Sequence, residues 1–475
     1  MFSYKYEIFT SVIEDKVNKG VLLKGERLPS IREIKKEFGL SIVSIQSGYE
    51  SLIMKGLVKS IPKRGYFVDK DFENSSQALP KTFFPISRDV DFIHNLELTS
   101  ARNKSSEANS FNNAVPGDVL IPQKLILRTM QNIIREKGAS LLRYYPSNGL
   151  EEFRNLISDR MRRFGTNIHS DEIIITDGAL QALYIAIRSI TNEGDVIAIE
   201  SPCVFSVLEV VASLKLKIIE IPMDIENGFD INYFEKVCDE HTIKALIITP
   251  NFHNPTGKLM SDSDKKNLVA TSANHKIPII ENDIYGDLHF TDQRPTCLKN
   301  FDDNENVMTF SSFSKSLAPG IRLGWLNAGK FFQQAEKIKF SLGRSVSPIY
   351  QELIVKLLLN NSYDRHLRSF RKKLNQQAML LLSALKMYFP EKSYFHQPKG
   401  GYSIWCELPE EINMTEFYNY CEAEKIHFTP GTTFSVTNEY QHCFRAVFSD
   451  YLNSESLVLI EKAGKKAHEL LLKYI

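Results

Sequence analysis

Long hydrophobic runs, paired cysteines and a strong net charge are all missing from this 475-residue chain. No apolar segment approaches the roughly 20 residues that a membrane span needs, and the first residues lack a signal-peptide pattern. The six cysteines form no C-x-x-C pair, and no histidine cluster has metal-ligand spacing, so we expect reduced core thiols and no metal. These absences favour a cytoplasmic protein of about two to four folding units without membrane contact.

The net charge of +1 hides an uneven distribution along the chain. Residues 1–70 contain 13 Lys and Arg against 8 Asp and Glu, which leaves the rest of the chain slightly acidic. A basic N-terminal end is compatible with double-stranded DNA as a partner. Many domains of this length that bind no nucleic acid carry a similar charge, so the local pattern has to decide.

The N-terminal region has the periodicity of short helices. Apolar residues recur at a helical period between Lys5 and Val21. Ser30 stands three residues before Glu33, which is a capping-box pattern for a second helix, and Gly39 marks its end.

A third helix is predicted to begin after Ser41, and two helices joined by a short turn that contains glycine form a helix-turn-helix pattern. Its inward face would consist of Ile42 or Val43, Ile45, Tyr49 and Leu52. A hairpin with a basic tip follows, because residues 57–61 and 66–68 flank Pro-Lys-Arg-Gly at 62–65. Such a hairpin is a wing, so the second helix of the motif would enter the major groove while the wing contacts phosphate or the minor groove.

Residues 27–33, 39–45, 56–58 and 65–68 together resemble the GntR-type winged helix. The resemblance implies a DNA-binding domain at residues 1–70 whose DNA contacts are Arg27, Arg32, Ser41, Ser44, Lys63 and Arg64. The two serines could equally serve only as helix caps, and the module could instead contact protein. Family members usually place an arginine where this chain has Ile42, so one base or phosphate contact is missing or comes from another residue.

Residues 71–112 are mixed in character, and we expect a linker there. Beyond them, short apolar segments alternate with helical stretches, which predicts an α/β fold with a mostly parallel sheet buried between helices. Ligands of such sheets lie at the carboxyl ends of the strands. The predicted strands are 172–176, 196–199, 217–221, 245–249, 278–280 and 307–310.

The segment 309–325 carries the most chemical information. Lys315 follows a Ser- and Phe-rich strand end, with hydroxyls at Ser312 and Ser314 and a guanidinium at Arg322. An amine in these surroundings suits condensation with an aldehyde beside a bound phosphate. The segment therefore predicts an anchor for pyridoxal 5'-phosphate (PLP).

Further motifs at residues 144–149, 176–183, 200–202, 251–257, 281–285, 400–405 and 444–445 resemble the class I aminotransferases of fold type I. The resemblance implies a PLP-binding domain at residues 113–475 with a smaller C-terminal α+β subdomain. It also implies a homodimer, in which Tyr144 reaches the phosphate bound by the other subunit.

The same resemblance assigns a role to each motif residue. Lys315 would be the catalytic amine, and Asn254 and Tyr285 would hydrogen-bond the phenolic oxygen of the ring. Arg445 would clamp the carboxylate of an effector. The phosphate would lie against Gly178 and Ala179, which open a helix, together with Ser312, Ser314 and Arg322. The remaining cofactor contacts would be Phe205 and Asn282.

Asn282 departs from the aminotransferase pattern at a position that matters for chemistry. Aminotransferases place here the aspartate that keeps the pyridine nitrogen protonated, and a neutral amide makes the ring a poorer electron sink. Asp283 could substitute only if the strand end twists, because neighbours on a strand point to opposite faces.

Two further departures weaken the pattern. Val204 stands where an aromatic ring is expected to stack on the pyridine, although Phe205 is adjacent. Ala179 and Leu180 replace side chains that usually offer polar contacts to the phosphate. These changes favour a site retained for binding over one kept for turnover.

A winged helix fused to an aminotransferase-like domain resembles the MocR subfamily of GntR regulators over nearly the whole chain. The resemblance implies a PLP-dependent transcription regulator that senses an amino compound or PLP itself. One alternative is a catalytically active aminotransferase that carries a winged helix, and another is a scaffold that no longer binds PLP. Arg445 favours a carboxylate-bearing amine as the effector.

Overall fold

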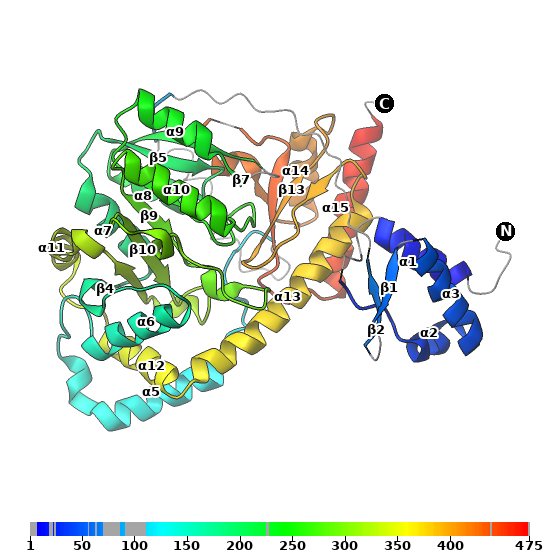
Figure 1. Ribbon diagram of the computed structural model, residues 1–475, viewed down its shortest axis with the longest axis horizontal. Coiled ribbons are helices and arrows are strands. Elements are labelled where there is room, and N and C mark those ends of the chain that lie inside the picture. Colours follow the sequence, from blue (N-terminus) through cyan, green and yellow to red (C-terminus); the bar gives the residue numbers. More distant parts are fainter. Residues whose placement is uncertain are drawn as a thin grey trace.

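The computed structural model describes residues 7–18, 22, 25–55, 57–61, 64–69, 86–90, 111–224, 228–437 and 439–473. A small N-terminal module, a large central sheet with its helices and a C-terminal sheet follow one another along the chain (Figure 1). No helix in these ranges is long and apolar enough to cross a membrane.

The described part of the N-terminal module consists of three helices and a two-stranded hairpin. The predicted capping box is confirmed, because Ser30 N–H donates to the Glu33 carboxylate and Glu33 N–H donates to Ser30 Oγ. Gly39 ends the second helix with a φ of 65°, where a residue without Cβ is favoured. The elements are α1 (Glu7–Asn18), α2 (Ile31–Phe38), α3 (Ile42–Met54), β1 (Val58–Ile61) and β2 (Gly65–Val68).

The inward face of α3 differs from the prediction at its first turn. Ile45, Tyr49 and Leu52 are fully buried as expected, but Ile42 is 51% exposed and Val43 is 71% exposed. The expectation that one of these two faces the core was wrong. Leu40, in the turn before the helix, packs against the core instead. The first turn of α3 therefore projects past the core, and its apolar side chains face solvent.

Part of the expected linker joins the large domain. Arg88–Asp89 form β3, which pairs antiparallel with residues 217–218 at the edge of the central sheet. Phe111 is 1% exposed, and its backbone bonds to His427 and Val447 of the C-terminal part. Residues 71–85 and 91–110 lie outside the described residues.

Within the described ranges, the central sheet has nine strands in the order β3-β6-β5-β8-β9-β10-β11-β4, with β7 paired to β6. The pairs from β6 through β10 are parallel, which confirms the predicted fold class, and β11 is antiparallel to both its neighbours. The strands are β4 (Ile173–Thr176), β5 (Val196–Ser201), β6 (Lys217–Asp224), β7 (Gly228–Phe229), β8 (Leu246–Ile248), β9 (Ile279–Asn282), β10 (Val307–Ser312) and β11 (Gly324–Asn327).

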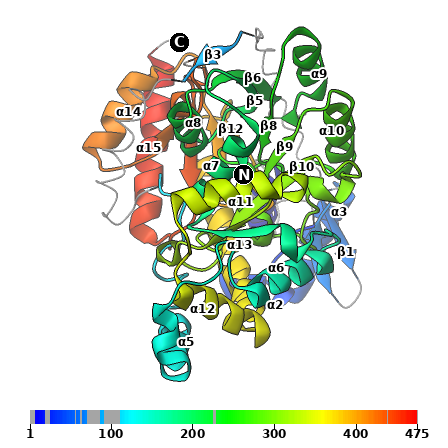
Figure 2. The ribbon, with the colours of Figure 1, turned by 90° about the vertical axis from the view of Figure 1, so that its left-hand side faces the viewer.

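Helices cover both faces of this sheet because its strands are apolar on both sides. Ile174 packs with α7, α8 and α11, whereas Ile173 and Ile175 pack with α5, α6 and α12 on the opposite face, where α9 and α10 also lie. Figure 2 shows α5 and α12 together at the lower edge of the molecule. The helices are α5 (Gln123–Lys137), α6 (Glu151–Arg163), α7 (Ala179–Ile190), α8 (Phe205–Ser213), α9 (Ile231–Glu240), α10 (Asp262–Asn274), α11 (Phe332–Leu342) and α12 (Pro348–Leu359).

The C-terminal part is an antiparallel sheet in the order β12-β13-β15-β14 packed against helices. Its longest helix, α13, runs from the neighbourhood of α12 to α15 (Figure 1). The elements are α13 (Ser362–Tyr388), β12 (Tyr394–Phe395), β13 (Ser403–Glu407), α14 (Met414–Ala423), β14 (Thr429–Pro430), β15 (Cys443–Val447) and α15 (Ser454–Leu472). Short 3-10 helices η1–η7 span Gly138–Leu142, Ser170–Glu172, Gly286–Leu288, Leu298–Phe301, Pro319–Ile321, Gly329–Phe331 and Gly431–Phe434.

Candidate functional site

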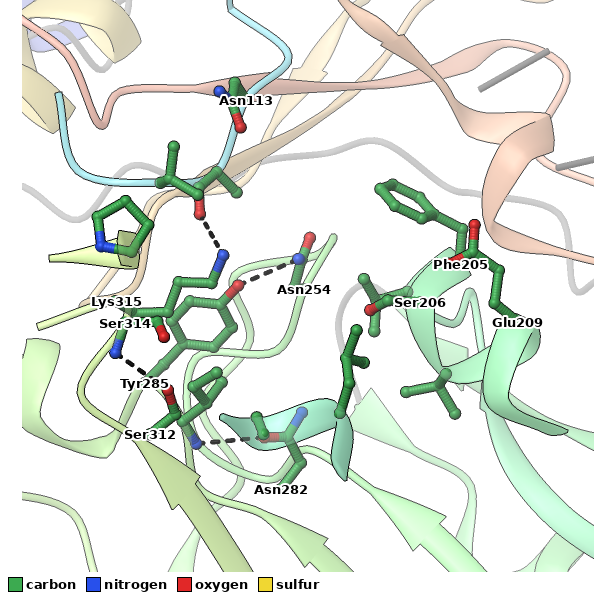
Figure 3. A pocket seen from close by; sticks show the side chains of 18 of the residues that line it. Asn113, Phe205, Ser206, Glu209, Asn254, Asn282, Tyr285, Ser312, Ser314 and Lys315 are labelled. Carbon is green, nitrogen blue, oxygen red and sulfur yellow. Dashed lines mark hydrogen bonds between the residues drawn. The ribbon is translucent and has the colours of Figure 1, made fainter. Parts of the chain in front are cut away.

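A cavity of about 470 Å³ lies at the carboxyl ends of β9 and β10, where the central sheet meets the C-terminal sheet (Figure 3). This is the edge of a parallel sheet at which ligands are expected. Most of the sequence-predicted cofactor residues line it together with Arg445, namely Ala179, Phe205, Asn254, Asn282, Tyr285, Ser312, Ser314, Lys315 and Arg322.

Lys315 projects into the cavity from the loop after β10. Its Nζ donates a hydrogen bond to the carbonyl of Ala114, at 2.9 Å. The backbone around it is held from the C-terminal part, since the Tyr402 hydroxyl donates to the Lys315 carbonyl and His366 Nε2 lies 2.8 Å from the Ser316 carbonyl. The C-terminal part therefore fixes the backbone that carries the lysine.

The N-terminus of α7 and Arg322 form a site with the chemistry of a phosphate cradle. Gly178 precedes α7 with a φ of 83° and no side chain caps the helix, so its first amides are available as donors. A Cβ at Gly178 would lie 3.0 Å from Arg322 Nη2, a tighter contact than side chains usually make, so glycine favours this close approach of the guanidinium.

Two hydroxyls complete the cradle. Ser312 Oγ accepts the N–H of Ser314 at 3.0 Å, which leaves the Ser312 proton to donate elsewhere. The Ser314 hydroxyl is buried and has no hydrogen-bond partner among the described residues. A buried hydroxyl without a partner is costly, and a phosphate oxygen would satisfy it. The residues present therefore fit PLP.

On the opposite side of the cavity, Arg445, Asn254 and Tyr285 form a hydrogen-bonded chain. Arg445 Nη1 donates to Asn254 Oδ1 at 2.9 Å, and Asn254 Nδ2 donates to the Tyr285 hydroxyl at 3.2 Å. Burial raises the pKa of Tyr285 although Arg445 and Asn254 act to lower it, so the phenol keeps its proton at neutral pH. Arg445 Nη2 also donates to Thr429 Oγ1 at 3.0 Å, which fixes the guanidinium beside the cavity.

Asn282 faces the cavity with a defined amide orientation. Its Oδ1 accepts the N–H of Ile284 at 3.2 Å, and because a backbone N–H can only donate, the Nδ2 lies on the side of Thr249 Oγ1, at 3.3 Å. One Nδ2 proton is used by Thr249, and the other makes the side chain a hydrogen-bond donor at the cavity, where a carboxylate would be an acceptor.

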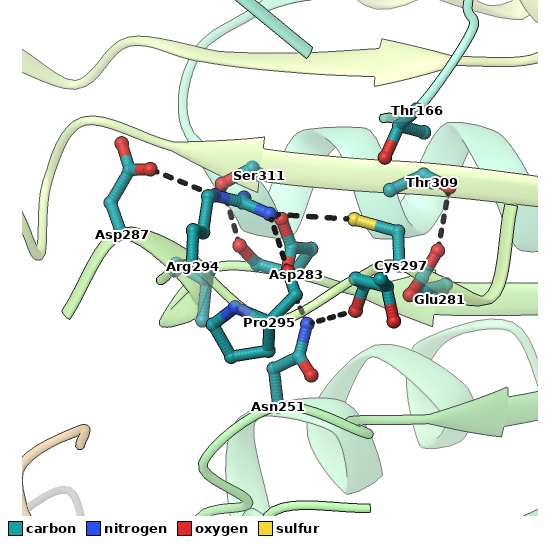
Figure 4. Close-up of polar contacts among 12 residues, drawn as sticks. Thr166, Asn251, Glu281, Asp283, Asp287, Arg294, Pro295, Cys297, Thr309 and Ser311 are labelled. Carbon is teal, nitrogen blue, oxygen red and sulfur yellow. Dashed lines mark hydrogen bonds and ion pairs between the residues drawn. The ribbon is translucent and has the colours of Figure 1, made fainter. Parts of the chain in front are cut away.

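Asp283 points to the other face of the sheet and does not line the cavity (Figure 4). Its carboxylate accepts from Asn251 Nδ2 at 3.0 Å and pairs with the guanidinium of Arg294. Its backbone N–H bonds to the Phe310 carbonyl at 2.9 Å, so the strand end keeps its ladder and does not twist. The substitution of Asp283 for the missing aspartate is therefore not realised.

The carboxylate of Asp283 belongs to a chain of alternating charges, buried at Asp283 and Arg294 and partly exposed at Asp364, that sequence reasoning missed. Arg294 Nε contacts Asp287 at 3.0 Å, Arg160 Nη2 contacts the same Asp287 at 3.1 Å, and Arg160 Nη1 contacts Asp364 at 2.5 Å. Burial alone would raise the pKa of Asp287, but Arg160 and Arg294 outweigh it and hold the pKa well below its usual range. Asp283, Asp287 and Arg294 follow β9, whereas Arg160 lies in α6 and Asp364 in α13, so no short sequence pattern predicts the chain.

The cavity is also lined by residues that sequence reasoning had not selected, whereas Tyr144, which it had selected, lies elsewhere. Val204 and Phe205 both line the cavity, and so do Asn112, Asn113 and Glu209, which sequence reasoning had not selected. The two asparagines fell within or next to the expected linker, and no motif marks them. Tyr144 lies outside the cavity and is 75% exposed, beneath the guanidinium of Arg344 at 5.1 Å from its ring centroid.

The predicted DNA contacts include arginines near the wing and on α2, and serines that cap α3. Arg27 bridges to Phe67 at the base of the wing, and Arg32 and Arg64 are exposed. Ser41 and Ser44 are engaged in the cap of α3, since Ser44 N–H donates to Ser41 Oγ at 3.1 Å and the two hydroxyls lie 2.8 Å apart. Lys63 lies outside the described residues.

Comparison with known proteins matches both parts of the chain. Residues 113–460 match the family described as aminotransferase class I and II, and residues 7–68 match the bacterial regulatory proteins of the gntR family. Two relatives are similar over most of their length. Uncharacterized HTH-type transcriptional regulator YjiR of Escherichia coli K12 is 30% identical over 93% of this chain and 94% of its own. HTH-type transcriptional regulator NorG of Staphylococcus aureus USA300 is 28% identical over 85% of this chain and 92% of its own.

Solved structures show the same fold for the large domain. The multiple substrate aminotransferase of Thermococcus profundus has a TM-score of 0.74 at 23% identity and covers 80% of this chain and 95% of its own. The alpha-aminoadipate aminotransferase LysN of Thermus thermophilus has a TM-score of 0.72 at 24% identity, over 79% of this chain and 95% of its own.

A winged helix and an aminotransferase-type cleft in one chain define a DNA-binding transcription regulator with an aminotransferase-like domain. The chain belongs to the aminotransferase class I and II family through its large domain and to the gntR family through its N-terminal module, which is the architecture of the MocR subfamily.

Proposed function

We propose that the cavity around Lys315 binds PLP covalently and recognises a carboxylate-bearing amine, and that its occupancy changes how the winged helices of a homodimer hold DNA. Membership of the aminotransferase class I and II family implies the use of PLP. The cofactor would supply an aldehyde that an amine can capture and a ring that withdraws electrons.

Different residues of the cavity would bind different parts of the cofactor and the effector. Arg322, Ser314 and the amides at the start of α7 would bind the phosphate, and Lys315 would provide the amine. Tyr285 would donate its proton toward the phenolic oxygen of the ring. Arg445 would pair with the carboxylate of the effector, which would take up N–H donors that now contact Asn254, Thr429 and the Asn112 carbonyl.

The orientation of Asn282 is the observation that carries the proposal. An amide N–H directed at a pyridine nitrogen stabilises the unprotonated ring, whereas a carboxylate stabilises the protonated ring. By leaving the ring unprotonated, Asn282 would make it a weaker electron sink, so loss of the α proton from a bound amine would be slow. A pocket that binds PLP and an effector amine but lets them react only slowly suits a sensor.

Sensing requires that the effector bind two states of the protein with different affinity. We place the domain boundaries of such a switch at residues 1–70, 71–112 and 113–475, with the middle segment joining the winged helix to the large domain. A homodimer accounts for exposed apolar side chains on and after α5, among them Leu127 at 60% and Leu142 at 88% exposure. Tyr144 follows this segment and would reach the partner's phosphate.

The proposal is tested by adding excess PLP to the full-length protein and recording its visible absorption, with the Lys315→Ala variant as control. We expect a band that the variant lacks. Single-turnover conversion to pyridoxamine phosphate by a panel of amino acids then distinguishes a sensor from an enzyme. Rates of roughly 1 per second or more, as in ordinary enzymes, would establish the alternative of an active aminotransferase, and a colourless protein would establish a scaffold without PLP.

A further inference from the structure

The first turn of α3 exposes apolar side chains that the fold does not need. Ile42 and Val43 are 51% and 71% exposed, whereas Ile45 on the core side is fully buried. β-branched residues lose side-chain freedom in a helix, so neither packing nor helix propensity accounts for them here. Their place is the part of a helix-turn-helix that enters the major groove.

The polar groups of the same turn are already engaged. Ser41 Oγ caps the helix by accepting the Ser44 N–H, and the two hydroxyls bond to each other. The next exposed polar side chain is Gln46, one turn after Ile42. With about 100° of rotation per residue, Ile42, Gln46 and Val43 share one face of the helix.

The base edges that match this face belong to A·T pairs. In the major groove the C5 methyl of thymine is the apolar feature, and a glutamine amide can pair with N6 and N7 of adenine. The flanks suit a duplex, because Arg32 and Lys35 on α2 and Arg64 on the wing are exposed cations that can contact phosphates. Glu50, two turns beyond Val43, places an exposed carboxylate on the helix and marks the end of the reading surface.

We propose that Ile42 and Val43 contact thymine methyl groups and that Gln46 contacts adenine, so that the recognition helix selects A·T pairs. The proposal rests on DNA binding by the module and adds the bases that it reads. A protein partner fits the apolar pair less well, because the cations around it match a polyanion.

The test starts from duplexes selected by the full-length protein out of a random pool. We expect A·T pairs at the positions read by each recognition helix. Thymines at these positions are then replaced one at a time by deoxyuridine, which removes only the methyl group. Affinity should fall about fourfold for each methyl contacted, from about 0.8 kcal/mol per buried carbon.

Paired variants assign the contacts. Ile42→Ala and Val43→Ala should each abolish the uracil penalty at one position, as a double-mutant cycle requires. Ile53→Ala makes the same change about 16 Å further along α3, and Val12→Ala makes it on α1, where Val12 is 40% exposed. Both controls should keep the full penalty. Arg64→Ala should weaken binding to thymine and uracil duplexes equally.

Selected sites without A·T enrichment, a uracil duplex bound as tightly as the thymine duplex, or a penalty that persists in both variants would overturn the proposal. So would a change in oligomeric state in Ile42→Ala with unchanged base preference, which would assign the pair to a protein contact. Absence of binding to any duplex even at low salt would overturn the regulator assignment, and this inference with it.

Discussion

The two faces of the sheet at the end of β9 have opposite characters, although Asn282 and Asp283 are adjacent in the chain. On the cavity face Asn282 is neutral, and the hydroxyl of Ser314 lies nearby without a partner among the described residues. On the far face Asp283 begins a chain of alternating charges in which each carboxylate has a guanidinium. The charges of the far face are paired within the chain, whereas the cavity face keeps a buried hydroxyl that the proposed cofactor phosphate would satisfy. We therefore propose that the far face contributes to stability and the cavity face to recognition.

The largest effect is expected from Arg294→Met on the far face. The substitution leaves Asp283 and Asp287 without the cation between them, and removal of one partner of a buried pair costs about 3–5 kcal/mol. Chemical denaturation of the cofactor-free protein measures this loss of unfolding free energy. An unfolding free energy within about 1 kcal/mol of the wild type would mean that the charged chain is not what holds this face.

The far face should also dominate the acid sensitivity. The folded-state pKa of Asp287 lies below its unfolded value of about 3.9, so its contribution is present above that pH and is lost as the pH falls below it. The difference in unfolding free energy between the wild type and Asp287→Asn should therefore shrink below about pH 4. A difference that stays constant between about pH 2 and 6 contradicts the assigned charge state.

On the cavity face, Arg322→Met should affect the ligand more than the fold. Loss of a charge-assisted contact to phosphate costs about 1.5–3 kcal/mol, so PLP affinity should fall roughly 10- to 100-fold. The unfolding free energy of the cofactor-free protein should change by less than about 1 kcal/mol. Equal losses in Arg322→Met and Arg294→Met without cofactor would erase the contrast between the faces.

The smallest effect is expected from Asn282→Asp, which restores a carboxylate at the cavity. Conversion of bound PLP by amino acids should accelerate by about tenfold or more, because a carboxylate stabilises the protonated ring. Asp283→Asn is the matched control: it should lower stability and leave the conversion rate unchanged. The opposite pattern would exchange the roles of the two residues.

Local patterns predicted much of this molecule. The capping box of Ser30 and Glu33, the buried strands and the lysine after β10 depend on neighbours within a few residues, which a sequence displays directly. The place of Asn282 followed from its spacing to Tyr285, and the structure puts it at the cavity. The exposure of Ile42 and Val43 was not predicted, because helical periodicity does not reveal that Leu40, which precedes the helix, packs against the core at this end of α3.

The sequence by itself determined the two kinds of domain and the amine at Lys315, since each depends on residue type and short-range spacing. Its resemblance to the class I aminotransferases marked Asn282 as the position where a carboxylate is missing. Only the tertiary structure decided that Asp283 cannot replace that carboxylate. Its partner Arg294 comes from the loop after β9, and the next member, Arg160, comes from α6. Because the pair of Asp283 and Arg294 is buried, breaking it is costly. The packing of the whole domain decides which distant segments meet, and the sequence does not show this directly.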